Sequence, residues 1–167
     1  MSILPLHGQD GQRTPIDVNL IIDGSSAYSG VRDEISAWLS GRLDQILADG
    51  DRVTVWSAGP TARVIYSGVM TSSAERESVK RSIRENNASG NTADFSSALN
   101  EAAGRQSSGF SYTLLISASP RSISGKTANQ LRYSRVEEFP NWRALVVGLN
   151  LDARVKRATD SFFISQP

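Results

Sequence analysis

Mainly apolar runs occur at six places along the chain, and each is short enough to form a β-strand. They occupy residues 16–23, 51–59, 62–70, 111–119, 142–150 and 161–165. Such runs, rich in β-branched residues and bounded by Gly, Pro, Asn or Asp, are typical of strands buried on both faces. Only a Gly-Pro-Thr tripeptide separates the second run from the third. That connection is too short for a crossover, so these two runs are predicted to form an antiparallel hairpin.

Between these runs, apolar residues recur at helical spacing. The clearest stripe contains Ile35, Leu39 and Leu43, and it predicts an amphipathic helix over 31–48. Ser72 and Glu75 have the spacing of a capping box, which predicts the start of a second, charged helix. Further helices are predicted over 95–104, 124–134 and 151–158, the one over 124–134 from a weak pattern.

Strands that alternate with helices indicate an α/β domain with helices on both faces of the sheet. We predict a single Rossmann-like, three-layer α/β/α domain over 16–167, preceded by a flexible leader over 1–15. Its central sheet is expected to be mainly parallel, with about six strands and one antiparallel edge strand. Ligands of such sheets bind beyond the carboxyl ends of the strands. The loops at 23–30, 87–94 and 117–127 therefore form the candidate functional region.

The composition excludes several classes of site and partner. The chain has no cysteine and one histidine, His7, so disulfides, thiolate zinc sites and a Ser-His-Asp triad are not expected. A net charge of +1 favours neither nucleic acid nor an anionic membrane surface. No apolar run approaches the length of about 18 residues that spans a membrane. If Met1 is the natural start, a cytoplasmic location is expected, and otherwise the protein could be exported.

Two patterns suggest a nucleotide site, and both lack the glycines that would hold a phosphate. Gly125, Lys126 and Thr127 match the end of a P-loop, but Pro120 stands where the first glycine of the pattern belongs. Proline has no N–H group to donate to a phosphate. The loop after the first strand likewise lacks the full glycine pattern of a dinucleotide fingerprint. A small nucleotide-binding or hydrolytic domain that uses Lys126 and Asp23 is kept as an alternative.

The acids near this edge of the sheet do not suggest a catalytic pair. Asp33 suits the first turn of its helix, and Asp94 suits the N-cap of the helix over 95–104. Asp23 then has no second carboxylate to work with, and no nucleophile has a visible base. We therefore expect that the protein is not an enzyme.

Asp23, Ser25 and Thr92 are instead candidate ligands of a hard divalent cation. Oxygen ligands from several loops are what such cations require, and these three residues lie in two of the candidate loops. The same side chains could equally cap turns and bond to loop backbone with no ion present.

The ordered set of segments resembles a von Willebrand factor A domain over about 16–165. The resemblance rests on a strand followed by Asp-x-Ser, a helix, "DRVTVWSAG", a Gly-x-Thr loop before "SSALNEAA", "YTLLIS" and "RALVVGLN". It implies a metal-ion-dependent adhesion site for Mg²⁺ or Mn²⁺, with Asp23, Ser25 and Thr92 as matching ligands. Ala27 and Ala118 stand where that family has a second serine and a second aspartate. The site is therefore expected to be degenerate, with no cofactor or only weakly bound Mg²⁺ or Mn²⁺.

The resemblance also implies a protein partner, bound through the loops at 24–30, 88–94 and 118–125. The residues expected to contact this partner are Ser26, Tyr28, Asn91 and Asp94. Tyr28 lies at the tip of its loop, where it either is exposed to the partner or packs locally. The other candidate aromatics, Trp38, Trp56, Tyr66 and Trp142, are predicted to pack in the core. The alternative is an intact Mg²⁺ or Mn²⁺ site that binds a carboxylate of the partner.

Overall fold

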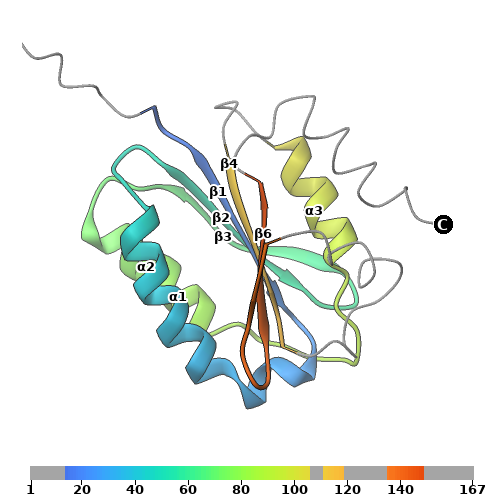
Figure 1. Ribbon diagram of the computed structural model, residues 1–167. Helices are drawn as coiled ribbons and strands as arrows, with labels where there is room; N and C mark the ends of the chain where they lie inside the picture. Colours follow the sequence, from blue (N-terminus) through green and yellow to red (C-terminus); the bar gives the residue numbers. More distant parts are fainter. Residues whose placement is uncertain (1–13, 106–110, 119–134, 149–167) are drawn as a thin grey trace, which may run out of the picture.

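The computed structural model describes residues 14–105, 111–118 and 135–148, and Figure 1 shows the arrangement of their helices and strands. The elements in chain order are β1 (Asp17–Asp23), η1 (Ser26–Gly30), α1 (Arg32–Ile46), β2 (Arg52–Ala58), β3 (Ala62–Val69), α2 (Ser73–Arg84), α3 (Phe95–Gly104), β4 (Ser111–Ser117), β5 (Arg135–Glu138) and β6 (Arg143–Gly148). The predicted helices over 124–134 and 151–158, the strand over 161–165 and most of the leader lie outside the described residues. Within the described ranges, no helix is long and apolar enough to cross a membrane.

The described strands form one mixed sheet in the order β3-β2-β1-β4-β6-β5. β1 is central and runs parallel to both β2 and β4. Its last residue, Asp23, is level with Ala58, and Ile22 is level with Ile116, so the carboxyl ends of these three strands meet at one edge. The loops that follow β1 and β2 and the residue that follows β4 are therefore brought together.

The expectation of a mainly parallel sheet with one antiparallel edge strand is wrong, because only the middle of the described sheet is parallel. β6 runs antiparallel to β4, and β5 pairs antiparallel with β6. The cause is β5, which the apolar pattern did not reveal because its sequence, RVEE, has one apolar residue in four. The chain therefore enters β6 from a short hairpin, closed by a 3.0 Å bond from Phe139 N–H to the Trp142 carbonyl. A hairpin connection reverses the strand direction that a crossover would have kept.

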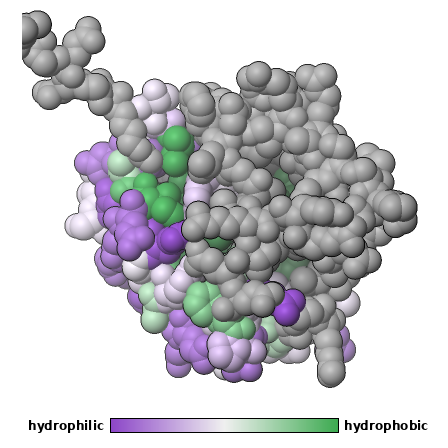
Figure 2. Space-filling view, in the orientation of Figure 1, coloured by the Kyte–Doolittle hydropathy of each residue, from purple (hydrophilic) through white to green (hydrophobic). Residues whose placement is uncertain are grey.

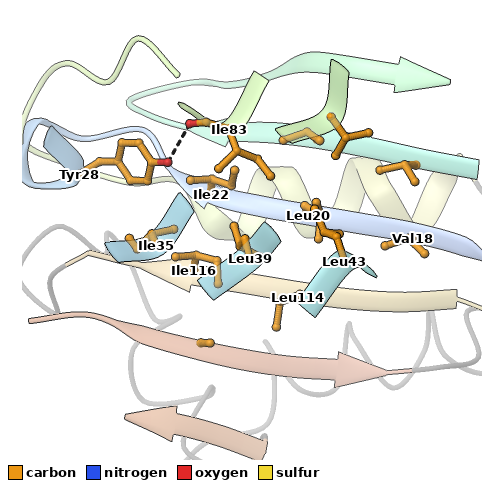
Figure 3. Packing of buried hydrophobic residues seen from close by; sticks show 14 of the residues in the cluster. Val18, Leu20, Ile22, Tyr28, Ile35, Leu39, Leu43, Ile83, Leu114 and Ile116 are labelled. Atoms are coloured by element: carbon orange, nitrogen blue, oxygen red, sulfur yellow. Dashed lines mark hydrogen bonds between the residues drawn. The ribbon is translucent and has the colours of Figure 1, made fainter. Parts of the chain in front are cut away.

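Helices cover both faces of the sheet, as expected for three layers. α1 and α2 lie together on one face and α3 lies on the other (Figure 1). β1 supplies both cores because its side chains alternate: Leu20 and Ile22 pack with α1 and α2, whereas Ile21 packs beside Phe95 and Leu99 of α3. Figure 3 shows the larger of the two cores, between the sheet and the helices α1 and α2.

The predicted helix starts and the predicted hairpin are confirmed. The Ser72 hydroxyl accepts a 3.2 Å bond from Ala74 N–H and contacts the Glu75 carboxylate, so it caps α2. The Asp94 carboxylate caps α3 by accepting a 3.0 Å bond from Ser97 N–H. β2 and β3 pair antiparallel, with a register shift that leaves one extra residue on β3.

The aromatic residues that were assigned to packing do pack against the cores. Trp56 is fully buried in the α3 core, and Trp38, Tyr66 and Trp142 contact the other core. Trp142 also stacks on Phe139, with ring centroids 3.9 Å apart. Its indole N–H donates a 3.1 Å bond to the Glu34 carboxylate of α1, which attaches the β5–β6 hairpin to that helix.

Candidate interaction site at the carboxyl ends of the strands

Asp23 lies at the centre of the candidate site and is fully buried. One carboxylate oxygen, Oδ1, accepts a 2.8 Å bond from the Ser25 N–H and a 2.6 Å bond from the Ser25 hydroxyl. The other, Oδ2, accepts a 2.9 Å bond from the N–H of Ala118. Because Ala118 follows β4 directly, this carboxylate joins the loop after β1 to the end of the neighbouring strand. Both oxygens of Asp23 therefore bind groups of the chain itself.

The two alanines in the candidate site contribute apolar packing. Ala118 is 4% exposed and belongs to the core between the sheet and the helices α1 and α2. Ala27 is half-buried and packs against the same core. Each therefore has a methyl group at a position where the resemblance implies an oxygen ligand. Neither side chain has an atom that binds a cation.

Backbone hydrogen bonds hold the two described loops of the site together. Ser26 N–H donates to the Gly90 carbonyl at 2.9 Å, and Ser89 N–H donates to the Gly24 carbonyl at 2.7 Å. Gly24 is required at this junction, since a Cβ there would lie 2.6 Å from both the backbone nitrogen of Gly59 and the Ser57 hydroxyl. Gly90 has φ of +80°, a conformation that other residues rarely adopt. The loops after β1 and α2 thus form one connected surface, which we call the crest (residues 24–30 and 88–94).

Polar side chains on the crest remain open to solvent. Ser26, Asn91 and Thr92 are exposed, as a partner-binding role for Ser26 and Asn91 requires. Asp94 is half-buried and its carboxylate caps α3, so the N-cap interpretation of this residue is confirmed. The rest of the predicted partner surface, residues 119–125, lies outside the described residues, as does Lys126.

Of the two interpretations of Tyr28, local packing is confirmed and exposure to a partner is wrong. Its ring is fully buried, and its hydroxyl donates a 2.8 Å bond to the Ile83 carbonyl in α2, as Figure 3 shows. Burial raises the pKa of Tyr28 to about 12. The sequence did contain a signal for this position, because Tyr28, Val31 and Ile35 continue the apolar stripe of α1 toward the N-terminus. Tyr28 therefore anchors the crest to α2 and offers no surface to a partner.

Asn86 is a site residue that the sequence did not single out. It is 2% exposed, and its amide Nδ2 donates a 3.1 Å bond to the backbone carbonyl of Asp23. The backbone carbonyl of Asn86 in turn accepts a 3.1 Å bond from the Arg32 guanidinium. Asn86 therefore ties the end of α2 to the end of β1. A polar residue just beyond a helix carries no pattern that would distinguish it from an ordinary loop residue.

The described donor set does not fit a divalent cation. Such cations take about six or more oxygen ligands, with carboxylates supplying the charge. Here one carboxylate, Asp23, is fully buried and both its oxygens accept bonds from the chain. The Ser25 hydroxyl donates to that carboxylate, while Thr92 lies on the exposed surface. Among the residues described, no three His, Cys, Asp or Glu side chains are grouped closely enough to hold a metal ion.

Comparisons with known proteins give structural likeness only. No family model and no curated protein matches the chain. Among solved structures, it is similar to von Willebrand factor type A from Catenulispora acidiphila, with 20% identity, a TM-score of 0.44, and coverage of 54% of this chain and 22% of that chain. It is also similar to a mutant of the PilB minor pilin from Streptococcus sanguinis, with 13% identity, a TM-score of 0.49, and coverage of 95% and 47% respectively.

The chain thus spans less than half the length of either of these two proteins. Identities and TM-scores are low in both, so no residue role is transferred from either one. The roles proposed below rest on the geometry of this chain.

Proposed function

We propose that this protein is a non-catalytic interaction module of von Willebrand factor A type, which binds a protein partner through its crest without a bridging metal. The observation that carries the proposal is the environment of Asp23. Its carboxylate accepts three hydrogen bonds from Ser25 and Ala118, so it acts as a structural clamp beneath the crest. Because groups of the chain itself donate these three bonds, recognition of the partner is left to the exposed side chains of the crest.

The crest has the properties of a preorganised binding surface. Its two loops are joined by backbone hydrogen bonds, and Tyr28 fixes its underside to α2. The conformational entropy of these loops is already lost when the protein folds. It is therefore not lost again when a partner binds, and this favours affinity. The exposed hydroxyl and amide groups of Ser26, Asn91 and Thr92 would supply hydrogen bonds to the partner. Loops held by a rigid sheet are also where binding residues are most often found.

Site-specific photo-crosslinking tests the crest as the binding surface. A photoreactive amino acid is introduced at Ser26 or Asn91 in cells of the source organism, and at Gln45 as the control. Gln45 is exposed near the end of α1, at the opposite edge of the sheet from the crest. We expect one and the same protein to crosslink from both crest positions and not from Gln45. Identical products from Gln45, or no product from either crest position, would refute the proposal.

Purified partner then allows a quantitative test. Asn91→Arg places a bulky charge on the crest and should weaken binding at least tenfold, whereas Gln45→Arg should leave the Kd unchanged. Thermal melting addresses the metal-dependent alternative, because a cation that binds only the folded state raises Tm. A rise in Tm with Mg²⁺ or Mn²⁺ that disappears in Thr92→Ala would favour that alternative over a metal-free crest.

A further inference from the structure

A groove runs between the edge strand β3 and helix α2. Its volume is about 320 Å³. Residues of one α2 face line one side, among them Ser78, Arg81 and Glu85, which are spaced three and four apart. Ile65 and Tyr66 of β3 line the other side, and both are half-buried against the core. The extra residue on β3 lies at this point, since Tyr66 pairs with Val55 and Val64 pairs with Trp56.

Two arginines in this groove, Arg63 and Arg81, have no carboxylate partner among the residues that the structure describes. Arg63 donates one 2.8 Å bond, to the backbone carbonyl of Asn87, and its guanidinium has further N–H groups to offer. Among the described residues, neither Arg63 nor Arg81 forms an ion pair. Arg76 and Lys80 of α2 instead pair with Asp49 and Asp44. Glu85 is the one acid that lines the groove, so the cations outnumber it.

A smaller polar hollow of about 160 Å³ continues the groove to the crest. It shares Arg63 and Asn87 with the groove, and Gly24 and Ser89 of the crest line its far side. The buried Ser57 hydroxyl also lines it, and no acidic residue does. A hollow with one guanidinium, several hydroxyls and no acid is suited to a carboxylate.

Within the described part of the chain, one buried polar atom beside the groove has no hydrogen-bond partner. Asn86 lines the groove and is 2% exposed, and the structure gives its Oδ1 no hydrogen bond. Buried polar atoms are nearly always satisfied, so this acceptor needs a donor that the described residues do not supply.

We propose that this groove binds an extended acidic segment of the protein partner, with one carboxylate of the segment in the hollow at Arg63 and a second near Arg81. An extended segment fits because β3 is the first strand of the sheet and its outer backbone edge is unpaired within the described sheet. The inference rests on the proposed function, and it adds the chemistry of the partner. It also extends the binding surface from the crest down the flank of α2.

Fluorescence anisotropy with a labelled ten-residue peptide of alternating Glu and Thr tests the charge preference. The same peptide with Gln in place of Glu is the neutral control, and a ten-residue oligothymidylate tests whether any polyanion suffices. Arg63→Gln and Arg81→Gln should each raise the Kd of the acidic peptide about threefold to fivefold, as expected for a partly exposed ion pair. Arg84→Gln is the matched control, because Arg84 is exposed on the same helix and lines neither the groove nor the hollow.

Each outcome is decisive. Binding of the acidic peptide alone, weakened by the two groove variants and unchanged in Arg84→Gln, supports the proposal. No binding of the acidic peptide at millimolar concentration, equal binding of the neutral peptide or the oligonucleotide, or equal loss in all three variants overturns it. If the crest crosslink from Asn91 persists unchanged in the Arg63→Gln/Arg81→Gln double variant, the groove inference fails while the proposed function stands.

Discussion

Replacing Asp23 by alanine should destabilise the protein even when no metal is available to it. The carboxylate of Asp23 accepts bonds from two backbone N–H groups and one hydroxyl, at 2.6–2.9 Å. Ser25 and Ala118, which carry the two N–H groups, are 1% and 4% exposed. Water therefore has little access to these donors once the carboxylate is removed.

The expected loss of stability follows from these bonds. Each buried N–H group left without an acceptor costs about 1–3 kcal/mol. Two of them would cost about 2–6 kcal/mol, and the hydroxyl of Ser25 can turn to another acceptor. Removing a buried carboxylate also removes its desolvation penalty, which offsets part of the loss. We expect a net decrease of about 2–4 kcal/mol in the free energy of unfolding, or roughly 4–16 °C in Tm at the usual 2–4 °C per kcal/mol.

Urea unfolding in EDTA measures this free energy without any contribution from divalent cations. Asp33→Ala is the control, because Asp33 is exposed in the first turn of α1 and should cost only about 0.3–1 kcal/mol. Asp23→Asn should fall between the two, since its amide keeps one acceptor but turns an N–H group toward Ala118 N–H. If Asp23→Ala unfolds in EDTA at the same urea concentration as the wild type, Asp23 is not a clamp, and a role as a metal ligand is restored to it.

Three further predictions concern the crest. Gly24→Ala should lower stability by about 1–3 kcal/mol in urea unfolding, because its Cβ would meet the Ser57 hydroxyl and a backbone nitrogen at 2.6 Å; a neutral result would mean that the loops can separate at little cost. Burial raises the pKa of Tyr28 from 10.0 to about 12, so the folded state keeps its proton longer and stability should fall as pH rises from about 10 to 12, by about 2 kcal/mol. Tyr28→Phe should remove this slope in melts across that pH range, and an unchanged slope would assign it to other groups. Thr92→Ala should leave Tm within about 1 °C of the wild type with or without Mg²⁺, since exposed residues that bind nothing contribute little; a Mg²⁺-dependent difference would restore Thr92 as a ligand.

Local patterns were sufficient for most elements of the fold. β1, β2, β3 and β4 were predicted from their apolar runs, and α1 and α3 from helical spacing, because each of these patterns is contained within a single segment. Capping by Ser72 and Asp94 was predictable for the same reason, since an N-cap and the N–H group it binds lie two or three residues apart. The strand β5 was missed because four residues with two acids carry no apolar period.

The candidate site was only half visible in the sequence. Asp23 and Ser25 were singled out, and they do bond to each other, because they are two residues apart. The side that Tyr28 faces was left open, although its spacing to Val31 and Ile35 continues the apolar stripe of α1. Asn86 was missed altogether, since its function is defined by a carbonyl 63 positions away.

By itself, the sequence determined most of the segments that form strands and helices, because each of these patterns lies within a single segment. The tertiary structure alone decided what Asp23 does with its charge, through a bond to Ala118 that spans 95 positions of the chain. It also decided the antiparallel direction of β6 and the groove between β3 and α2. The physical reason is the same in each case: periodicity and capping act over a few residues, whereas burial and hydrogen-bond partners depend on segments that meet only in the folded chain.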